Sequence, residues 1–210
     1  MRRAARAVGR QRFRDMSKQI VLAIAGSPRR GGNSDRLLAE AMRGTRDAGH
    51  EVVHVVVQDY NLQGCLACGG CGRDGNCRVS DDMQKVFADL DRADHIILAA
   101  PVFFMGLPGK LKMLIDRCQV YWSRKYRLKQ PVGRERPGGN GVLIAIGGTT
   151  FEKLFDGSRN VAKSLFSVLE VHYRDELLLS RVDRRGDIER HPEALRRAYE
   201  IGLHIGDRTD

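Results

Sequence analysis

Four of the five cysteines in this 210-residue chain fall within the short stretch "GCLACGGCGRDGNC", residues 64–77. They have the spacing C-x2-C-x2-C-x5-C and are Cys65, Cys68, Cys71 and Cys77. Thiolates are soft ligands, so four of them suit a [4Fe–4S] cluster or a zinc ion, and a disulfide or a redox-switching pair is a further option. Three thiols at x2 spacing can surround one face of a cuboidal cluster, and Gly72 and Gly75 let Cys77 return to the fourth iron. Structural zinc sites more often pair two separated C-x2-C knuckles. The spacing therefore favours a [4Fe–4S] cluster, with zinc and free or switching thiols as the alternatives.

The surroundings of these cysteines fit a redox role. Arg73 and Arg78 would offset the negative charge of a thiolate-ligated cluster. The chain has no apolar leader, which predicts a reducing, cytoplasmic setting where clustered cysteines usually serve metal or redox chemistry. Cys118 lies outside the motif, and we expect it to be a buried core thiol.

A second candidate site is the loop "GSPRRGGNSD", residues 26–35, which follows an apolar stretch. Its glycines let backbone amides approach an anion, and the start of the next helix adds its dipole. Gly32 and Asn33 stand where a Walker A loop needs Lys and Ser or Thr, and the loop is not G-x-G-x-x-G either. It therefore predicts a cradle for a monophosphate, the alternative being an ordinary turn with solvated arginines. Ser27, Asn33 and Ser34 offer side-chain hydrogen bonds in this loop, and Arg29 and Arg30 lie nearby.

Two more loops follow apolar stretches and complete the predicted pocket. Residues 101–106 would form an apolar shelf that suits a planar heterocycle, unless these side chains simply pack as core. Residues 147–151 form a Gly/Thr loop, which is otherwise a plain strand-to-helix turn. Together the three loops describe a pocket for a flat ring on a phosphorylated tail, and flavin mononucleotide (FMN) is the candidate cofactor. The residues concerned are Pro101, Phe103, Phe104, Met105, Gly106, Gly147, Gly148 and Thr149.

The elements that must position these loops alternate along the chain. Strands are expected at 19–26, 50–58, 94–102, 140–148 and 171–182, and helices at 35–49, 80–93, 106–122, 156–170 and 191–206. Asn33 or Ser34 should cap the first helix and Ser80 the second, and residues 123–139 should be a loop. Alternating βα units predict an α/β fold with a doubly wound parallel sheet, in which ligands bind beyond the carboxyl ends of the strands.

The net charge of +10 is concentrated at one end of the chain. Residues 1–18 carry seven cations against Asp15 alone, a net charge of +6, which leaves +4 for the other 192 residues. We expect residues 1–18 to be a disordered arm, or translation to start at Met16, and residues 19–210 to form one domain. Nucleic-acid binding is therefore not expected, and no apolar run reaches the about 20 residues of a membrane span.

The loop "GSPRRGGNS", the stretch "PVFFMGLPGKLKMLIDR" and the five-unit order resemble the flavodoxin-like, NADPH-dependent FMN reductase family. The cysteine segment followed by "DDM" resembles its iron–sulfur flavoprotein branch, and the likeness covers roughly residues 19–180. It implies a five-stranded sheet of order 2-1-3-4-5, with FMN phosphate at Ser27, Arg29, Asn33 and Ser34. It also implies an isoalloxazine ring against residues 101–106, with residues 147–150 closing the site and a [4Fe–4S] cluster on the four cysteines. Relatives often have tyrosine at the position of Phe103, so a hydroxyl contact is lost here.

The resemblance implies a redox flavoprotein that exchanges electrons with a one-electron carrier such as ferredoxin and reduces a quinone or oxygen. No catalytic acid or base is required, and we expect His95 and His172 to be packed or surface residues. Relatives form dimers or tetramers in which one subunit's cluster approaches another's flavin, so a homodimer or homotetramer is expected, with residues 110–122 as an interface element. The alternatives are an NAD(P)H-dependent FMN or quinone reductase without a cluster, and a thiol/flavin redox sensor.

Overall fold

The computed structural model of the chain describes residues 18–132 and 138–207. Its centre is a five-stranded, all-parallel sheet of order β2-β1-β3-β4-β5, which confirms the predicted flavodoxin-like topology. The strands are β1 (Ile20–Ala25), β2 (Glu51–Val56), β3 (His95–Pro101), β4 (Gly139–Ile146) and β5 (Val171–Leu179).

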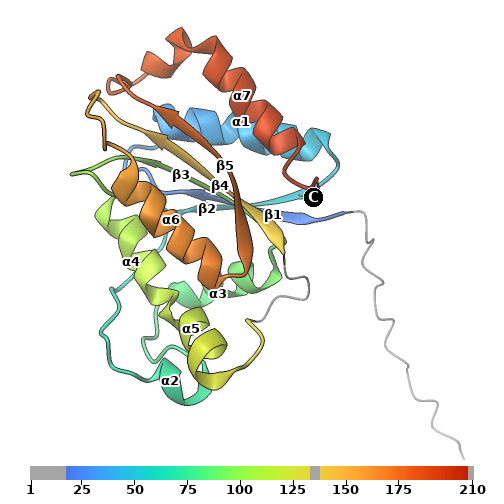
Figure 1. Cartoon of the computed structure of the whole chain (residues 1–210), viewed down its shortest axis with the longest axis vertical. Coiled ribbons are helices and arrows are strands. Elements are labelled where there is room, and N and C mark those ends of the chain that lie inside the picture. The colour runs from blue at the N-terminus through green and yellow to red at the C-terminus, as the bar shows by residue number, and fades with distance from the viewer. Residues whose placement is uncertain (1–17, 133–137, 208–210) are drawn as a thin grey trace, which may run out of the picture.

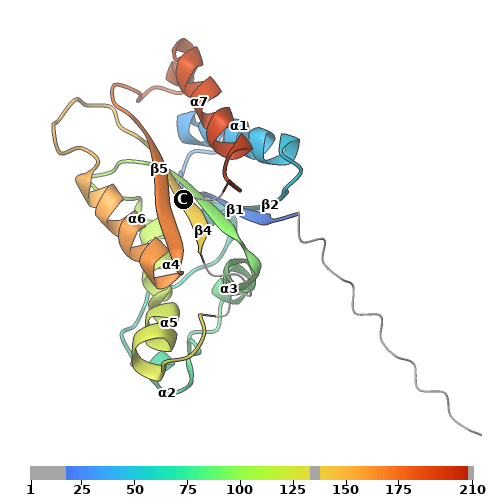
Figure 2. The same ribbon diagram turned by 45° about the vertical axis from the view of Figure 1, so that its right-hand side comes forward.

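Helices cover both faces of this sheet, as Figures 1 and 2 show. On one face lie α1 (Asn33–Asp47) and α7 (Pro192–Leu203). On the other lie α3 (Met83–Arg92), α4 (Gly109–Arg117) and α6 (Asp156–Val168), with α2 (Cys71–Asp74), α5 (Gln119–Trp122) and the π-helical turn η2 (Ser123–Leu128) beyond them. Two short 3-10 turns, η1 (Val57–Asp59) and η3 (Asp187–Arg190), follow β2 and β5.

The core forms two layers because strand side chains alternate between the faces of the sheet. Leu22 and Ile24 of β1 belong to the layer beneath α3, α4 and α6, whereas Val21 and Ala23 belong to the layer beneath α1 and α7. All six residues of β1 are buried, as expected for a central strand that is covered on both faces.

Some of the predicted boundaries were wrong. Gly32 is the N-cap of α1, with no capping side chain, and Asn33 already lies inside the helix. Helix α3 begins at Met83 rather than near Ser80, and its Met83 amide donates to Asp81 Oδ1 (3.0 Å). Residues 123–128 form η2 instead of a loop, in a position where Lys125 Nζ donates to the Ser167 carbonyl (2.8 Å).

Strand β5 ends at Leu179, three residues before its predicted end at 182. The chain turns away there at Arg181, whose φ is +61°, and the Val182 amide then donates to the Gly147 carbonyl (3.0 Å). This contact brings the loop after β5 against the loop after β4. The predicted N-terminal arm, residues 1–18, lies outside the described residues except for Lys18.

Candidate flavin and cysteine sites

The loop after β1 is built around a serine turn. Ser27 Oγ accepts a hydrogen bond from the Arg29 amide (3.0 Å) and donates one to the Arg29 carbonyl (3.1 Å). Gly31 has a φ of +63°, a left-handed conformation that suits glycine, and it turns the chain into α1. The first helical hydrogen bond of α1 runs from the Arg36 amide to the Gly32 carbonyl (3.0 Å). The N–H groups of residues 33–35 precede that bond and are therefore available to an anion at the N-terminus of the helix.

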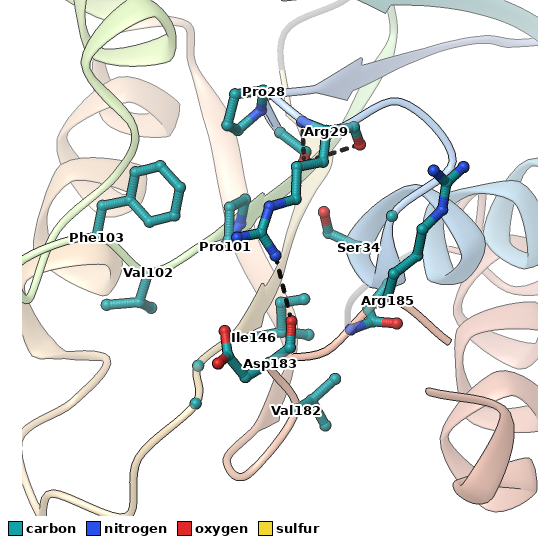
Figure 3. A pocket seen from close by; sticks show the side chains of 15 residues that line it. Pro28, Arg29, Ser34, Pro101, Val102, Phe103, Ile146, Val182, Asp183 and Arg185 are labelled. Atoms are coloured by element: carbon teal, nitrogen blue, oxygen red, sulfur yellow. Dashed lines mark hydrogen bonds between the residues drawn. The ribbon is translucent and has the colours of Figure 1, made fainter. Parts of the chain in front are cut away.

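Arg29 and Ser34 face the space in front of these amides. Figure 3 shows the Ser34 hydroxyl pointing into the pocket and Arg29 Nη1 donating to the Asp183 carbonyl (3.4 Å). Arg30, in contrast, forms an ion pair with Asp59 and does not line the pocket. Asp35 Oδ2 accepts a hydrogen bond from the Gly31 amide (2.8 Å), and burial raises the pKa of this carboxyl above its ordinary value.

The side chain of Asn33 forms hydrogen bonds with the backbone of the loop after β5, which the sequence did not indicate. Its Nδ2 donates to the Arg184 carbonyl (2.8 Å), and its Oδ1 accepts from the Gly186 amide (3.0 Å) and the Ile188 amide (3.4 Å). Asn33 therefore joins the start of α1 to the loop after β5. Its predicted contact with a phosphate stays a prediction, and the amide of its side chain is already engaged.

The loop after β3 forms a tight turn at the mouth of the pocket. The amide of Phe103 donates to the carbonyl of Gly106 and the reverse bond also forms, both at 2.9 Å. Phe104 and Met105 between them have φ values of +47° and +64°, which L-residues seldom adopt. Phe104 is fully exposed and Met105 is 38% exposed. The turn therefore presents apolar side chains to solvent at the sheet edge and does not bury them as core.

Four loops meet at this edge and enclose a cavity of about 70 Å³ (Figure 3). That volume suits a group the size of a phosphate, so a three-ring heterocycle would extend outward over the exposed turn. Eight of the twelve predicted flavin-site residues line the cavity, whereas Phe104, Met105, Gly106 and Thr149 do not. The eight are Ser27, Arg29, Asn33, Ser34, Pro101, Phe103, Gly147 and Gly148.

The sequence did not point to the fourth of these loops, which follows β5. Val182, Asp183 and Arg185 line the cavity, and Arg185 Nη2 donates to the Arg30 carbonyl (3.2 Å). The signal available was the cationic run "RVDRRGD" directly after a strand, since strand ends meet at one edge of a parallel sheet. Arg29 and Arg185 give this cavity a positive character.

The four cysteines of the motif all line a second cavity, of about 280 Å³. Cys65 and Cys68 are exposed, whereas Cys71 and Cys77 are half-buried and pack against the core. Ala67, Gly69 and Gly75 have positive φ values, so the segment folds back on itself. Helix α5 and the turn η2 form the opposite wall through Gln119, Trp122, Ser123 and Arg127.

The thiols of the inner pair have defined partners. Cys71 Sγ lies 3.3 Å from Ser123 Oγ, and Arg117 Nε donates to Cys77 Sγ (3.2 Å). Over residues 18–132 and 138–207, no group of three or more His, Cys, Asp or Glu side chains forms a site that could hold a metal ion. The thiols line a common cavity instead. In a multi-iron cluster each cysteine binds a different iron, so the four ligands surround the cluster and do not converge on one metal ion.

The predictions for Cys118, His95 and His172 are confirmed. Cys118 is buried outside the cavity, and burial raises the pKa of its thiol to about 12. His95 is buried, where its Nδ1 accepts a hydrogen bond from the Asn140 amide (2.9 Å), and His172 is exposed. Within the described part of the chain, no helix is both long enough and apolar enough to cross a membrane.

Comparisons with known proteins agree with this arrangement. The sequence profile of the family described as NADPH-dependent FMN reductase matches residues 20–154. An iron-sulfur flavoprotein of Methanosarcina thermophila is 34% identical over 152 residues, which are 72% of this chain and 73% of that protein. An iron-sulfur flavoprotein of Methanocaldococcus jannaschii is 38% identical over 97 residues, 46% of this chain and 50% of that protein.

Among solved structures, an NAD(P)H:quinone oxidoreductase from Methanothermobacter marburgensis superposes with a TM-score of 0.67. The match covers 92% of this chain and 98% of that protein, and at 19% identity it shows the shared fold alone. The family profile and the similar sequences show the family as well as the fold. The chain belongs to the NADPH-dependent FMN reductase family, in its iron–sulfur flavoprotein branch, and is a flavin-dependent oxidoreductase.

Proposed function

We propose that the chain holds FMN at the carboxyl edge of the sheet and a [4Fe–4S] cluster on Cys65, Cys68, Cys71 and Cys77. In this role it passes electrons between a one-electron carrier such as ferredoxin and an acceptor such as a quinone or oxygen, in the cytoplasm. The observation that carries the proposal is the presence of two separate cavities. One collects all four thiols of the motif, and the other collects the polar loops at the strand ends.

The flavin cavity fits FMN by its chemistry. The free amides at the start of α1, the Ser34 hydroxyl and the Arg29 guanidinium would bind the phosphate, which is an anion with several acceptor oxygens. Pro101 and Phe103 line the same cavity, and the ring would lie against them and the exposed turn of residues 103–106. Residues 147–149 would close the site from the end of β4.

The cysteine cavity fits an iron–sulfur cluster by its donors and its size. Four soft ligands surround about 280 Å³, and exposed Arg73, Arg78 and Arg127 lie nearby to balance the negative charge of a thiolate-bound cluster. A flavin exchanges one or two electrons whereas a cluster exchanges one, so a chain that holds both converts between the two kinds of carrier.

The two cavities are lined by different parts of the chain. Loop 101–106 leads into α4, and α5 continues α4 away from the sheet edge (Figure 1). The cysteine cavity is lined by Arg117 at the end of α4, by α5 and by η2. At 1.5 Å per residue, α4 from Gly109 to Arg117, where the lining of the cysteine cavity begins, spans about 13 Å. Because electron transfer slows steeply with distance, we propose a homodimer or homotetramer in which one subunit's cysteine loop approaches another's flavin.

One observation favours a second candidate function, an NAD(P)H-dependent FMN or quinone reductase without a cluster. Two of the four thiols, Cys65 and Cys68, are exposed, as free thiols can be. The same exposure is compatible with the third option, a thiol/flavin redox sensor.

Anaerobic purification, with iron, sulfide, zinc and FMN measured per chain, separates these functions. We expect about one FMN, about four iron atoms and about four sulfide ions after cluster reconstitution. The variant Cys77→Ser should lose iron and keep FMN, because its thiol lines the cysteine cavity only. Cys118→Ser is the matched control and should keep both. Bound FMN with no iron after reconstitution would show that the chain is a flavoprotein without a cluster. One zinc ion per chain would show that the four cysteines form a zinc site.

A further inference from the structure

Arg117, at the end of α4, is a charged side chain that the chain buries almost completely. Only 1% of it is exposed, and all five of its N–H donors face an acceptor. Nη1 donates to the Gln63 carbonyl (3.0 Å) and to Asp81 Oδ2 (2.8 Å), while Nη2 donates to the Val79 carbonyl (3.0 Å) and Asp81 Oδ1 (3.2 Å). The fifth donor, Nε, points at Cys77 Sγ at 3.2 Å.

The carboxylate partner is held just as firmly. Asp81 is 2% exposed and accepts hydrogen bonds from the Gln63 and Met83 amides (2.8 and 3.0 Å) in addition to the guanidinium fork. Burial works to raise the pKa of Asp81, but the bonds from Arg117 and these amides hold it below its ordinary value. A buried charge pair is costly unless every donor and acceptor is used. Here both groups are saturated, so the direction of Nε is fixed.

This network fixes both ends of the cysteine segment. Gln63 precedes Cys65, and Val79 and Asp81 follow Cys77, so one guanidinium joins the two ends of the loop to α4. We propose that Arg117 is a positioning residue that orients Cys77 for the cluster and raises the reduction potential of that cluster. The inference rests on the proposed function, because it assigns a role toward a cluster on the four cysteines.

The physical reason lies in the charge change on reduction. A cluster gains one negative charge when it accepts an electron, and hydrogen bonds and positive charge at its sulfur ligands stabilise that reduced state. Arg117 donates a charge-assisted hydrogen bond to one sulfur from a site that solvent does not reach, while Asp81 balances the charge of the guanidinium. Loss of the guanidinium should therefore make the cluster harder to reduce.

A purely structural tether is the competing explanation, and Arg124 provides the control for it. Arg124 Nε donates to the Gly75 carbonyl (2.9 Å), inside the same loop, and Nη1 contacts Asp91 (3.4 Å). Like Arg117, it joins the cysteine loop to the α4–α5–η2 segment. Its hydrogen-bond partners over the described residues are not thiols.

The test compares Arg117→Gln, Arg117→Lys and Arg124→Gln with the wild type, each purified anaerobically as the full chain with FMN bound. Iron per chain, the thermal midpoint of unfolding and the midpoint potential of the cluster, from an optical and EPR redox titration, are measured. Arg117→Gln should lower the electron affinity of the cluster about tenfold, a shift of about 59 mV to more negative potential for a one-electron couple. Arg117→Lys keeps the charge and should recover part of that shift. Arg124→Gln should lower the unfolding midpoint and leave the potential unchanged.

Each outcome decides something. Equal potentials in wild type and Arg117→Gln, or equal shifts in Arg117→Gln and Arg124→Gln, would overturn the role of Arg117 and leave the proposed function intact. A wild-type chain without iron and sulfide would overturn the proposed function itself. If Arg117→Gln does not fold because Asp81 loses its partner, Arg117→Lys carries the test: its potential must lie below that of the wild type, and an unchanged value contradicts the proposal.

Discussion

Residue types and spacings indicated most of the chemistry, but not which side chains would form hydrogen bonds with distant parts of the chain. The cysteine spacing identified the four residues that line one cavity. Arg117 was not singled out, because its partners at positions 63, 77, 79 and 81 come together only through the fold. Asn33 shows the same limit: its partners at 184–188 are more than 150 residues away.

The arginine pair at the first loop allows a matched test of the flavin site. Arg29 lines the cavity, whereas its neighbour Arg30 is paired with Asp59 outside it. Arg29→Ala would remove the proposed charge-assisted hydrogen bond to the phosphate and should weaken FMN binding at least about tenfold. Fluorescence titration of apoprotein with FMN measures this affinity. Arg30→Ala should stay within about threefold of wild type, and an equal loss in both variants would indicate a general electrostatic effect.

At the scale of elements, the order of strands and helices followed from hydrophobic pattern, but the details of the loops did not. The alternation of buried strands and amphipathic helices can be read from the hydrophobic periodicity of the sequence. The turn at 103–106 is different. The residues "FFMG" do not predict that Phe104 and Met105 both have positive φ, because turns with two such residues normally contain Asn-Gly. Tertiary contact with α6 accompanies the turn, because the Met105 carbonyl lies directly against Gly157.

That contact predicts the effect of a single methyl group. A Cβ at position 157 would lie 2.1 Å from the Met105 carbonyl oxygen, so Gly157→Ala must push the turn away from α6. We expect a loss of about 1–3 kcal/mol in the free energy of unfolding and weaker FMN binding, although alanine favours helices. Chemical denaturation and flavin titration measure the two effects. Gly109→Ala in α4, where a Cβ meets nothing within 4 Å, is the control and should not destabilise the chain.

Residues that suit the turn at 103–106 better should stabilise the chain and weaken its binding of FMN. Phe104→Asn together with Met105→Gly places the residues that favour positive φ at both positions, and Phe104 is fully exposed and has little packing to lose. The double variant should be more stable by about 1–2 kcal/mol and should bind FMN more weakly, because the apolar surface for the ring is removed. Thermal unfolding of the apoprotein and flavin titration test both parts. Unchanged FMN affinity would show that residues 104 and 105 do not contact the ring.

At the scale of the whole molecule, the five-stranded topology was predictable and the placement of the second site was not. The motif follows β2, which ends at the same sheet edge as the other strands, so the sequence did not show that the four thiols would lie against α5 and η2. The contacts of Arg117 and Arg124 hold the segment there. Exposed Leu66, Trp122 and Arg127 line that cavity, and the exposed residues Arg73, Tyr126 and Lys129 lie within two positions of its lining residues in the sequence.

This distribution of charge predicts how an electron carrier approaches. Reduction of the chain by a small acidic one-electron carrier should slow as ionic strength rises, because screening weakens the attraction between opposite charges. Arg127→Glu with Lys129→Glu should slow the reaction further at low salt. Stopped-flow absorbance follows the rate. Arg196→Glu, an exposed site on α7 across the sheet, is the control and should have little effect, and equal slowing there would point to net charge alone.

The two cavities share no lining residue, so oxidative damage at one of them need not affect the other. Damage by oxygen would start at the exposed Cys65 and Cys68, and nothing in that reaction touches the strand-end loops that enclose the other cavity. If FMN and the cluster bind as proposed, a molecule damaged in this way would keep its FMN and lose its cluster. In the proposed homodimer or homotetramer, the FMN of such a subunit would still lie against the intact cysteine loop of a neighbour.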